Sequence, residues 1–190
     1  MPADRLLEAL RSQIARAVTE PSTVRGKGNA GVAAAARAYL TQLDLAKLAA
    51  DPEAFPALLD QRTDSLLKSF QGEARKRWGL ARKILTLFLR DAVYNVHLRE
   101  AYGLEVLERQ LELPLDGESA KRVRRDYRKL RKNQPDLPKL PGWKGPFVLT
   151  RQDSRDHQKA ALKVAQAKGL KARIHLDAFF WSLERDEPRP

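Results

Sequence analysis

Apolar residues recur along this chain at helical spacing, and that pattern predicts helices over almost its whole length. Near the start, Leu6, Leu10 and Ile14 mark one face of an amphipathic helix that ends before Pro21. Further helices are expected over residues 29–43, from Asp51 onward, and over 64–70. The only candidate strand is PFVL at 146–149, and it is short. The pattern therefore predicts an all-α fold, a multi-helix bundle.

The longest helical region is expected between Gly72 and Gly103, where apolar side chains from Leu80 to Val96 share one face. Gly79 could break or kink its early part. Proline and glycine crowd residues 135–146, which predicts an irregular connector there. The chain is expected to form one all-helical domain over residues 1–190, and a division of that domain into two lobes stays open.

The composition excludes several kinds of chemistry. The chain has no cysteine, which rules out disulfides, thiolate metal sites and cysteine nucleophiles. Its three histidines stand at no metal-ligand spacing, so neither a metal site nor a cofactor is expected. No apolar run approaches the roughly 18 residues of a membrane span, and the charged start lacks a signal-peptide pattern. A cytoplasmic, nucleoid-associated protein is expected.

Positive charge is concentrated in the later part of the chain. The net charge is +12, and residues 71–175 carry 25 basic and 12 acidic side chains, against 9 and 8 in residues 1–70. Such a confined positive field is typical of a protein that meets a polyanion, which favours nucleic acid as the partner. Another anionic partner, or charge that serves solubility alone, remains the alternative.

The segment KRVRRDYRKLRK at 121–132 has eight basic residues in twelve. Val123, Tyr127 and Leu130 form one narrow apolar stripe on the predicted helix, and the rest of its surface is cationic. Phosphate groups suit such a surface because arginine forks match their oxygens. The alternative is a solvated surface helix. The predicted nucleic-acid-binding residues are Arg122, Arg125, Arg128, Lys129 and Lys132 here, with Arg75, Arg82, Lys83 and Arg155 elsewhere.

Lys159 and Asp177 lie eighteen residues apart in KAALKVAQAKGLKARIHLDAFFW. The segment reads as a helix, a glycine stop, a short connector and a second helix. Asp177 could simply be the N-cap of that second helix, because a carboxylate accepts hydrogen bonds from the first free N–H groups. It could also face a site together with Lys159.

The spacing from Lys159 to Asp177 resembles the catalytic segment of helix-hairpin-helix DNA glycosylases with lyase activity, and WGLARKILTLF resembles an upstream segment of that family. The resemblance implies a two-lobed helical fold acting on damaged or modified double-stranded DNA. It implies that Lys159 attacks C1′ of a flipped nucleotide to form a Schiff base. It also implies that Asp177 stabilises the developing positive charge.

The chain departs from that family where the DNA-binding hairpin is expected. The residues before Lys159, TRQDSRDHQ, contain no glycine, and the glycine of LPGW (140–143) lies seventeen residues upstream of the lysine. Arg151 and Arg155 would have to replace the hairpin contacts. Two other functions stay open: a non-catalytic helical nucleic-acid-binding module, and a subunit whose basic helix meets an acidic protein. The base recognised and the oligomeric state are not predicted.

Overall fold

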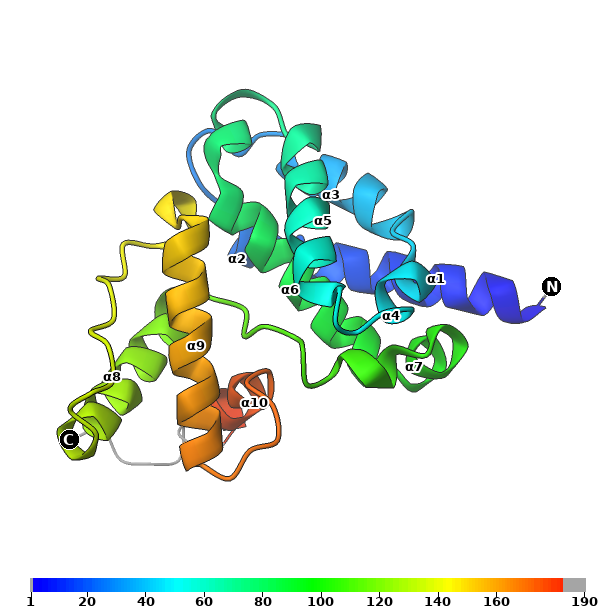
Figure 1. Cartoon of the computed structure of the whole chain (residues 1–190). Coiled ribbons are helices and arrows are strands. Elements are labelled where there is room, and N and C mark those ends of the chain that lie inside the picture. Colours follow the sequence, from blue (N-terminus) through cyan, green and yellow to red (C-terminus); the bar gives the residue numbers. More distant parts are fainter. Residues whose placement is uncertain (1, 183–190) are drawn as a thin grey trace.

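The protein is all-α, as predicted (Figure 1). The computed structural model describes residues 2–182, and within that range it contains helices and loops without a β-strand. The α-helices are α1 (Pro2–Ala17), α2 (Pro21–Val24), α3 (Val32–Thr41), α4 (Leu45–Ala49), α5 (Phe55–Ser69), α6 (Trp78–Tyr94), α7 (Val96–Tyr102), α8 (Gly117–Asn133), α9 (Arg151–Ala167) and α10 (His175–Ser182). Short 3-10 helices are η1 (Gly72–Lys76), η2 (Leu104–Leu107) and η3 (Pro146–Val148).

The buried apolar residues form two separate clusters, so the domain has two lobes. The first lobe runs from α1 to η2, and α6 lies at its centre. Leu80, Ile84 and Phe88 recur at every fourth position of α6 and are fully buried among the surrounding helices. The helical spacing of the sequence thus produces a core helix that holds the first lobe together.

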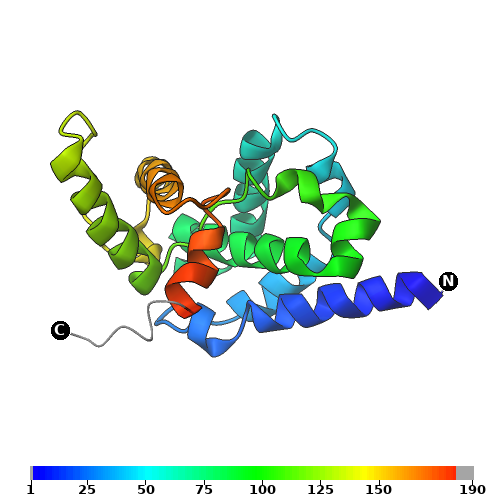
Figure 2. The same ribbon diagram turned by 90° about the horizontal axis from the view of Figure 1, so that it is seen from below.

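The second lobe consists of α8, α9 and α10, and lies to one side of the first (Figure 2). The short helix η3 packs on the first lobe through Phe147. Val123 and Tyr127 of α8 pack with Val164 of α9 and Phe180 of α10. The loop before α10 returns to the first lobe, because Ile174 belongs to that lobe's core. No helix among residues 2–182 is long and apolar enough to cross a membrane.

The long helix expected between Gly72 and Gly103 is divided into three elements: η1, α6 and α7. The break after α6 falls at Asn95, whose side chain accepts a hydrogen bond from the backbone N–H of Leu98 and caps α7. Gly103 ends α7 with a φ of 62°, a left-handed conformation that favours glycine. A polar capping residue therefore interrupts a stretch whose apolar pattern continues.

Gly79 does not interrupt α6, and its small size serves packing. A Cβ at this position would lie 2.3 Å from the carbonyl oxygen of Pro146 and 2.6 Å from Cβ of Leu149. Glycine therefore lets η3 approach the first turn of α6. The candidate strand at 146–149 is wrong, because Pro146–Val148 form the 3-10 helix of this contact.

Candidate nucleic-acid interface

α8 begins at a well-defined cap. The Asp116 carboxylate accepts hydrogen bonds from the backbone N–H groups of Glu118 and Ser119, each at 2.9 Å. Ser119 Oγ in turn accepts from the Asp116 N–H at 2.9 Å and donates to the carbonyl oxygen of Pro114 at 2.8 Å. This capping box satisfies N–H groups that a helix start otherwise leaves free, and fixes where the basic helix projects.

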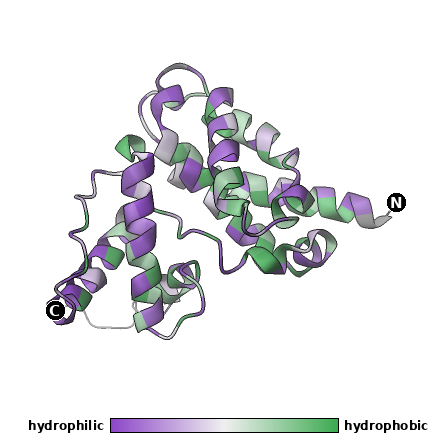
Figure 3. Ribbon diagram, viewed as in Figure 1, coloured by the Kyte–Doolittle hydropathy of each residue, from purple (hydrophilic) through white to green (hydrophobic). Residues whose placement is uncertain are grey.

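One face of α8 is cationic and exposed to solvent. Hydrophilic residues, purple in Figure 3, run along much of α8 and α9. At 3.6 residues per turn, the exposed basic side chains of α8 fall within about a third of the helix circumference. They are Lys121, Arg125, Arg128, Lys129 and Lys132, hereafter the α8 basic face.

The α8 basic face has little compensating negative charge. Arg125 forms an ion pair with the carboxylate of Asp126 at 2.8 Å. In the part of the chain that the structure describes, no carboxylate pairs with Arg128, Lys129 or Lys132. These side chains keep their charges and hydrogen-bond donors available to a polyanion.

Arg122 has a different environment from the rest of the predicted set. Its guanidinium donates to Glu118 Oε1 at 2.7 Å and to the carbonyl oxygen of Phe180 at 2.6 Å, and its side chain is 18% exposed. The bond to Phe180 holds α10 against α8. Arg122 therefore stabilises the second lobe from the side of α8. Lys121, which was not among the predicted nucleic-acid-binding residues, lies on the exposed face.

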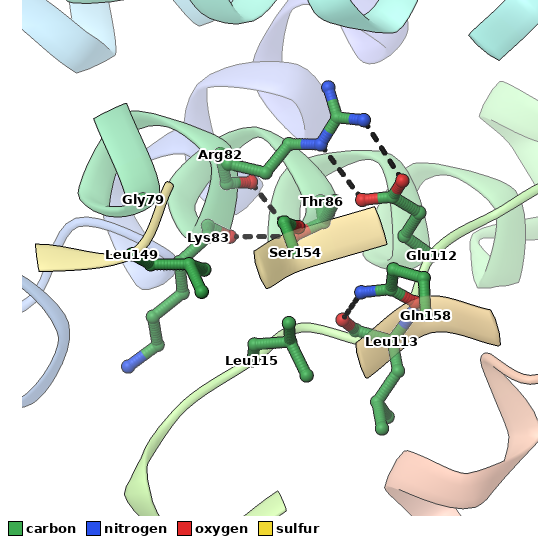
Figure 4. A pocket seen from close by; sticks show the side chains of 10 residues that line it. All are labelled: Gly79, Arg82, Lys83, Thr86, Glu112, Leu113, Leu115, Leu149, Ser154 and Gln158. Atoms are coloured by element: carbon green, nitrogen blue, oxygen red, sulfur yellow. Dashed lines mark hydrogen bonds and ion pairs between the residues drawn. The ribbon is translucent and has the colours of Figure 1, made fainter. Parts of the chain in front are cut away.

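Arg82 does not lie on a nucleic-acid-binding surface, contrary to the expectation. Arg82 is only 6% exposed, and its guanidinium donates two hydrogen bonds to the carboxylate of Glu112, at 2.8 and 2.9 Å (Figure 4). It also donates to Thr63 Oγ1 at 2.9 Å and pairs with Asp60 at 3.0 Å. The buried charge is thus matched by carboxylates of the same chain, as burial requires.

The other predicted nucleic-acid-binding residues outside α8 lie in different environments. Arg75 is exposed on η1. The side chain of Lys83 is only 12% exposed and lies 3.9 Å from the Asp116 carboxylate. Arg155 is exposed, and pairs with Asp60 at 2.9 Å, joining α9 to α5. Apart from Arg75, these cations have partners inside the protein, and they do not extend the α8 basic face.

Lys159 and Asp177 have separate environments. Lys159 is exposed on α9, and among residues 2–182 no hydrogen bond or ion pair joins its amine to Asp177. The Asp177 carboxylate instead pairs with Arg90 of α6, and Arg90 also holds Asp91 at 2.7 Å. Asp177 is the third residue of α10 rather than the residue before it, so the N-cap interpretation is wrong.

The ionisation of Asp177 reflects its position between the lobes. Its side chain is 14% exposed, and burial raises the pKa of this carboxyl, because an ionised form loses hydration. The positive charge of Arg90 and its hydrogen bond act in the opposite direction and do not overcome burial. The sequence did not reveal Arg90 as the partner, since the two residues lie 87 positions apart.

No protein-family model, curated protein or solved structure matches this chain.

Proposed function

We propose that this protein is a helical nucleic-acid-binding protein that holds the phosphate backbone of double-stranded DNA against the α8 basic face. The observation that carries the proposal is the row of exposed cations on one rigid, capped helix. Arg128, Lys129 and Lys132 have no carboxylate partner among the described residues. A regular helix spaces such charges at fixed intervals, which suits a polymer with repeating phosphates.

The arrangement favours binding over chemistry on the sugar. In the chemistry that the resemblance implies, the Lys159 amine attacks C1′ while a nearby carboxylate stabilises the positive charge that develops there. The Asp177 carboxylate is occupied by Arg90, and Lys159 extends from the solvent-exposed side of α9. Glycosylase and lyase activity rests on the spacing resemblance alone.

The proposal is tested by the salt dependence of binding to a fluorescent DNA duplex, followed by anisotropy. Each phosphate contact contributes a slope of about 0.9 to the plot of log affinity against log salt. The double variant Lys129→Gln with Lys132→Gln should bind more weakly and reduce that slope by about 2, since it removes two contacts. The sequence of the duplex should matter little, because phosphate contacts do not distinguish bases.

The matched control is Lys47→Gln with Lys68→Gln, which removes two exposed lysines from α4 and α5 of the first lobe. It lowers the net charge by the same amount but leaves α8 intact. An equal loss in both double variants would mean that only the overall charge attracts DNA. Binding that is independent of salt, or unchanged by the α8 substitutions, would reject the proposal.

A further inference from the structure

A cavity of about 120 Å³ lies between α8 and the connector (residues 134–145). Its size is well above the roughly 10–15 Å³ that a single water molecule needs, so a larger group fits. The lining residues are Arg124, Tyr127, Arg128, Arg131, Lys139 and Leu140. Four of these six are cations, three from α8 and one from the connector. We call this feature the connector cavity.

Two of the four cations around the connector cavity are held in place by hydrogen bonds. Arg124 and Arg131 each donate one hydrogen bond to a connector carbonyl, that of Pro141 and of Leu137 respectively, the latter at 2.9 Å. A guanidinium has five N–H donors, so four remain on each for a ligand. The arginines occupy positions i, i+4 and i+7 of α8 and therefore point to one side. The guanidinium groups of Arg124 and Arg131 are therefore positioned before any ligand binds.

The connector cavity has no internal counter-charge. No carboxylate lines it, and within the described part of the chain none pairs with Arg124, Arg128, Arg131 or Lys139. Four like charges around one small space repel each other unless an anion enters. Tyr127 and Leu140 complete the lining with ring and alkyl surface, and the remaining space can hold a compact anion.

The number of cations favours a ligand with two negative charges. A phosphate monoester carries about −1.5 to −2 at neutral pH and has three acceptor oxygens, whereas a phosphodiester within a strand carries one charge. Arg128 belongs both to this cavity and to the α8 basic face, so a strand lying on that face leads into the cavity.

We propose that the connector cavity binds the terminal phosphate of the nucleic-acid strand held by α8. The inference rests on the proposed function, and it makes the protein one that recognises strand ends. The cavity selects the end by charge, while the exposed face holds the adjoining backbone without regard to sequence.

The test compares three forms of one short duplex: with a 5′-terminal phosphate, with a 3′-terminal phosphate, and with hydroxyl groups only. At about 0.15 M salt, where surface charges are screened beyond about 8 Å, the wild-type protein should bind one phosphorylated form about tenfold more tightly than the hydroxyl form. Anisotropy gives the affinity for each of the three duplexes, and hence the ratio of each phosphorylated form to the hydroxyl form.

The cavity variant is Arg128→Gln with Lys139→Gln, and the control is Lys129→Gln with Lys144→Gln. All four side chains are exposed and none makes a hydrogen bond within the described residues, so both variants should fold. The cavity variant should bring the affinity ratio close to one. The control, which removes the same net charge from α8 and the connector, should weaken all three duplexes while the ratio stays near ten.

Equal, salt-dependent binding of all three duplexes by the wild type would overturn the inference and leave the proposed function standing. A second result would also overturn the inference. The cavity would bind inorganic phosphate, as seen by phosphorus NMR, and lose it in the cavity variant, while the wild type bound all three duplexes equally. The ligand would then be free phosphate. Absence of binding to any duplex would reject both proposals.

Discussion

At the residue scale, Asp177 shows how burial sets the proton affinity of a group that the sequence presented as catalytic. The carboxyl is enclosed between the lobes, and its pKa is raised by burial despite the adjacent Arg90. A carboxyl whose pKa is higher in the folded protein binds its proton more tightly there than in the unfolded chain. Its contribution to the free energy of unfolding therefore decreases as pH rises from the unfolded value of about 3.9 through the folded value.

Asp177→Asn should consequently become more stable relative to the wild type as pH rises from about 4 to 7. The amide carries no charge to desolvate, and it can still accept a hydrogen bond from Arg90. Urea unfolding at several pH values measures the difference. Asp136→Asn, at an exposed connector position, is the control and should follow the wild type. A difference that falls with pH would mean that the ion pair with Arg90 outweighs burial.

Lys159 permits an equally direct prediction. Because its amine is exposed and joined to no carboxylate among the described residues, we expect no covalent adduct when the protein is incubated with an abasic duplex and borohydride. Lys159→Ala should change DNA affinity by no more than the loss of one surface charge. A trapped adduct that disappears in Lys159→Ala would instead establish Schiff-base chemistry and restore the glycosylase hypothesis.

At the element scale, the approach of η3 to α6 depends on Gly79. Gly79→Ala would place a Cβ against the backbone of Pro146, which cannot rotate away as a flexible side chain could. We expect a loss of about 1–3 kcal/mol in the free energy of unfolding. Urea denaturation monitored by circular dichroism measures it. Gly117→Ala is the matched control: no atom lies within 4 Å of the added Cβ, and alanine favours a helix.

Periodicity predicted the class of the elements well, and their ends less well. The basic helix was expected over 121–132 and extends over 117–133, because the Asp116 and Ser119 capping box starts it a turn earlier. The region from Gly72 to Gly103 was expected as one helix, but Asn95 caps a new one inside it. Hydrophobic spacing continues across such a cap, so the pattern alone does not locate it.

The candidate site was less predictable because charge alone does not reveal burial. Arg82 and Arg128 are the same residue type, and both were predicted to bind nucleic acid, yet one is buried and the other exposed. Arg82 is buried because Glu112, thirty residues away, supplies a matching carboxylate. The connector cavity was missed for a similar reason, since Lys139 comes from a segment that looked like a simple linker.

At the scale of the whole molecule, buried charge joins the two lobes. Arg82 of the first lobe pairs with Asp60 at 3.0 Å and with Glu112, which lies on the segment leading into α8. Asp60 also pairs with Arg155 of α9 at 2.9 Å. The Asp60 carboxylate thus pairs with a buried arginine and an exposed one, and links both lobes in one network.

Arg82→Met should lower the free energy of unfolding by about 3–5 kcal/mol, because it leaves the buried carboxylate of Glu112 without a partner. Adding Glu112→Leu should recover a large part of the loss, since the double variant buries no unpaired charge. Arg75→Met, at an exposed position, should stay within about 0.5 kcal/mol of the wild type. Urea unfolding gives all three values. A mild effect of Arg82→Met alone would mean that the buried pair contributes little to the free energy of unfolding.

Side chains of α8 bind the connector through its backbone carbonyl oxygens, and this affects which changes the connector can tolerate in evolution. Tyr127 donates to the carbonyl oxygen of Pro138 at 3.2 Å, and Arg131 to that of Leu137 at 2.9 Å. Arg124 donates to the carbonyl of Pro141. Every amino acid supplies such an oxygen, so the connector residues that do not line the cavity are free to change in identity. The length of the connector is constrained, because one inserted or deleted residue would displace these carbonyl oxygens from their donors.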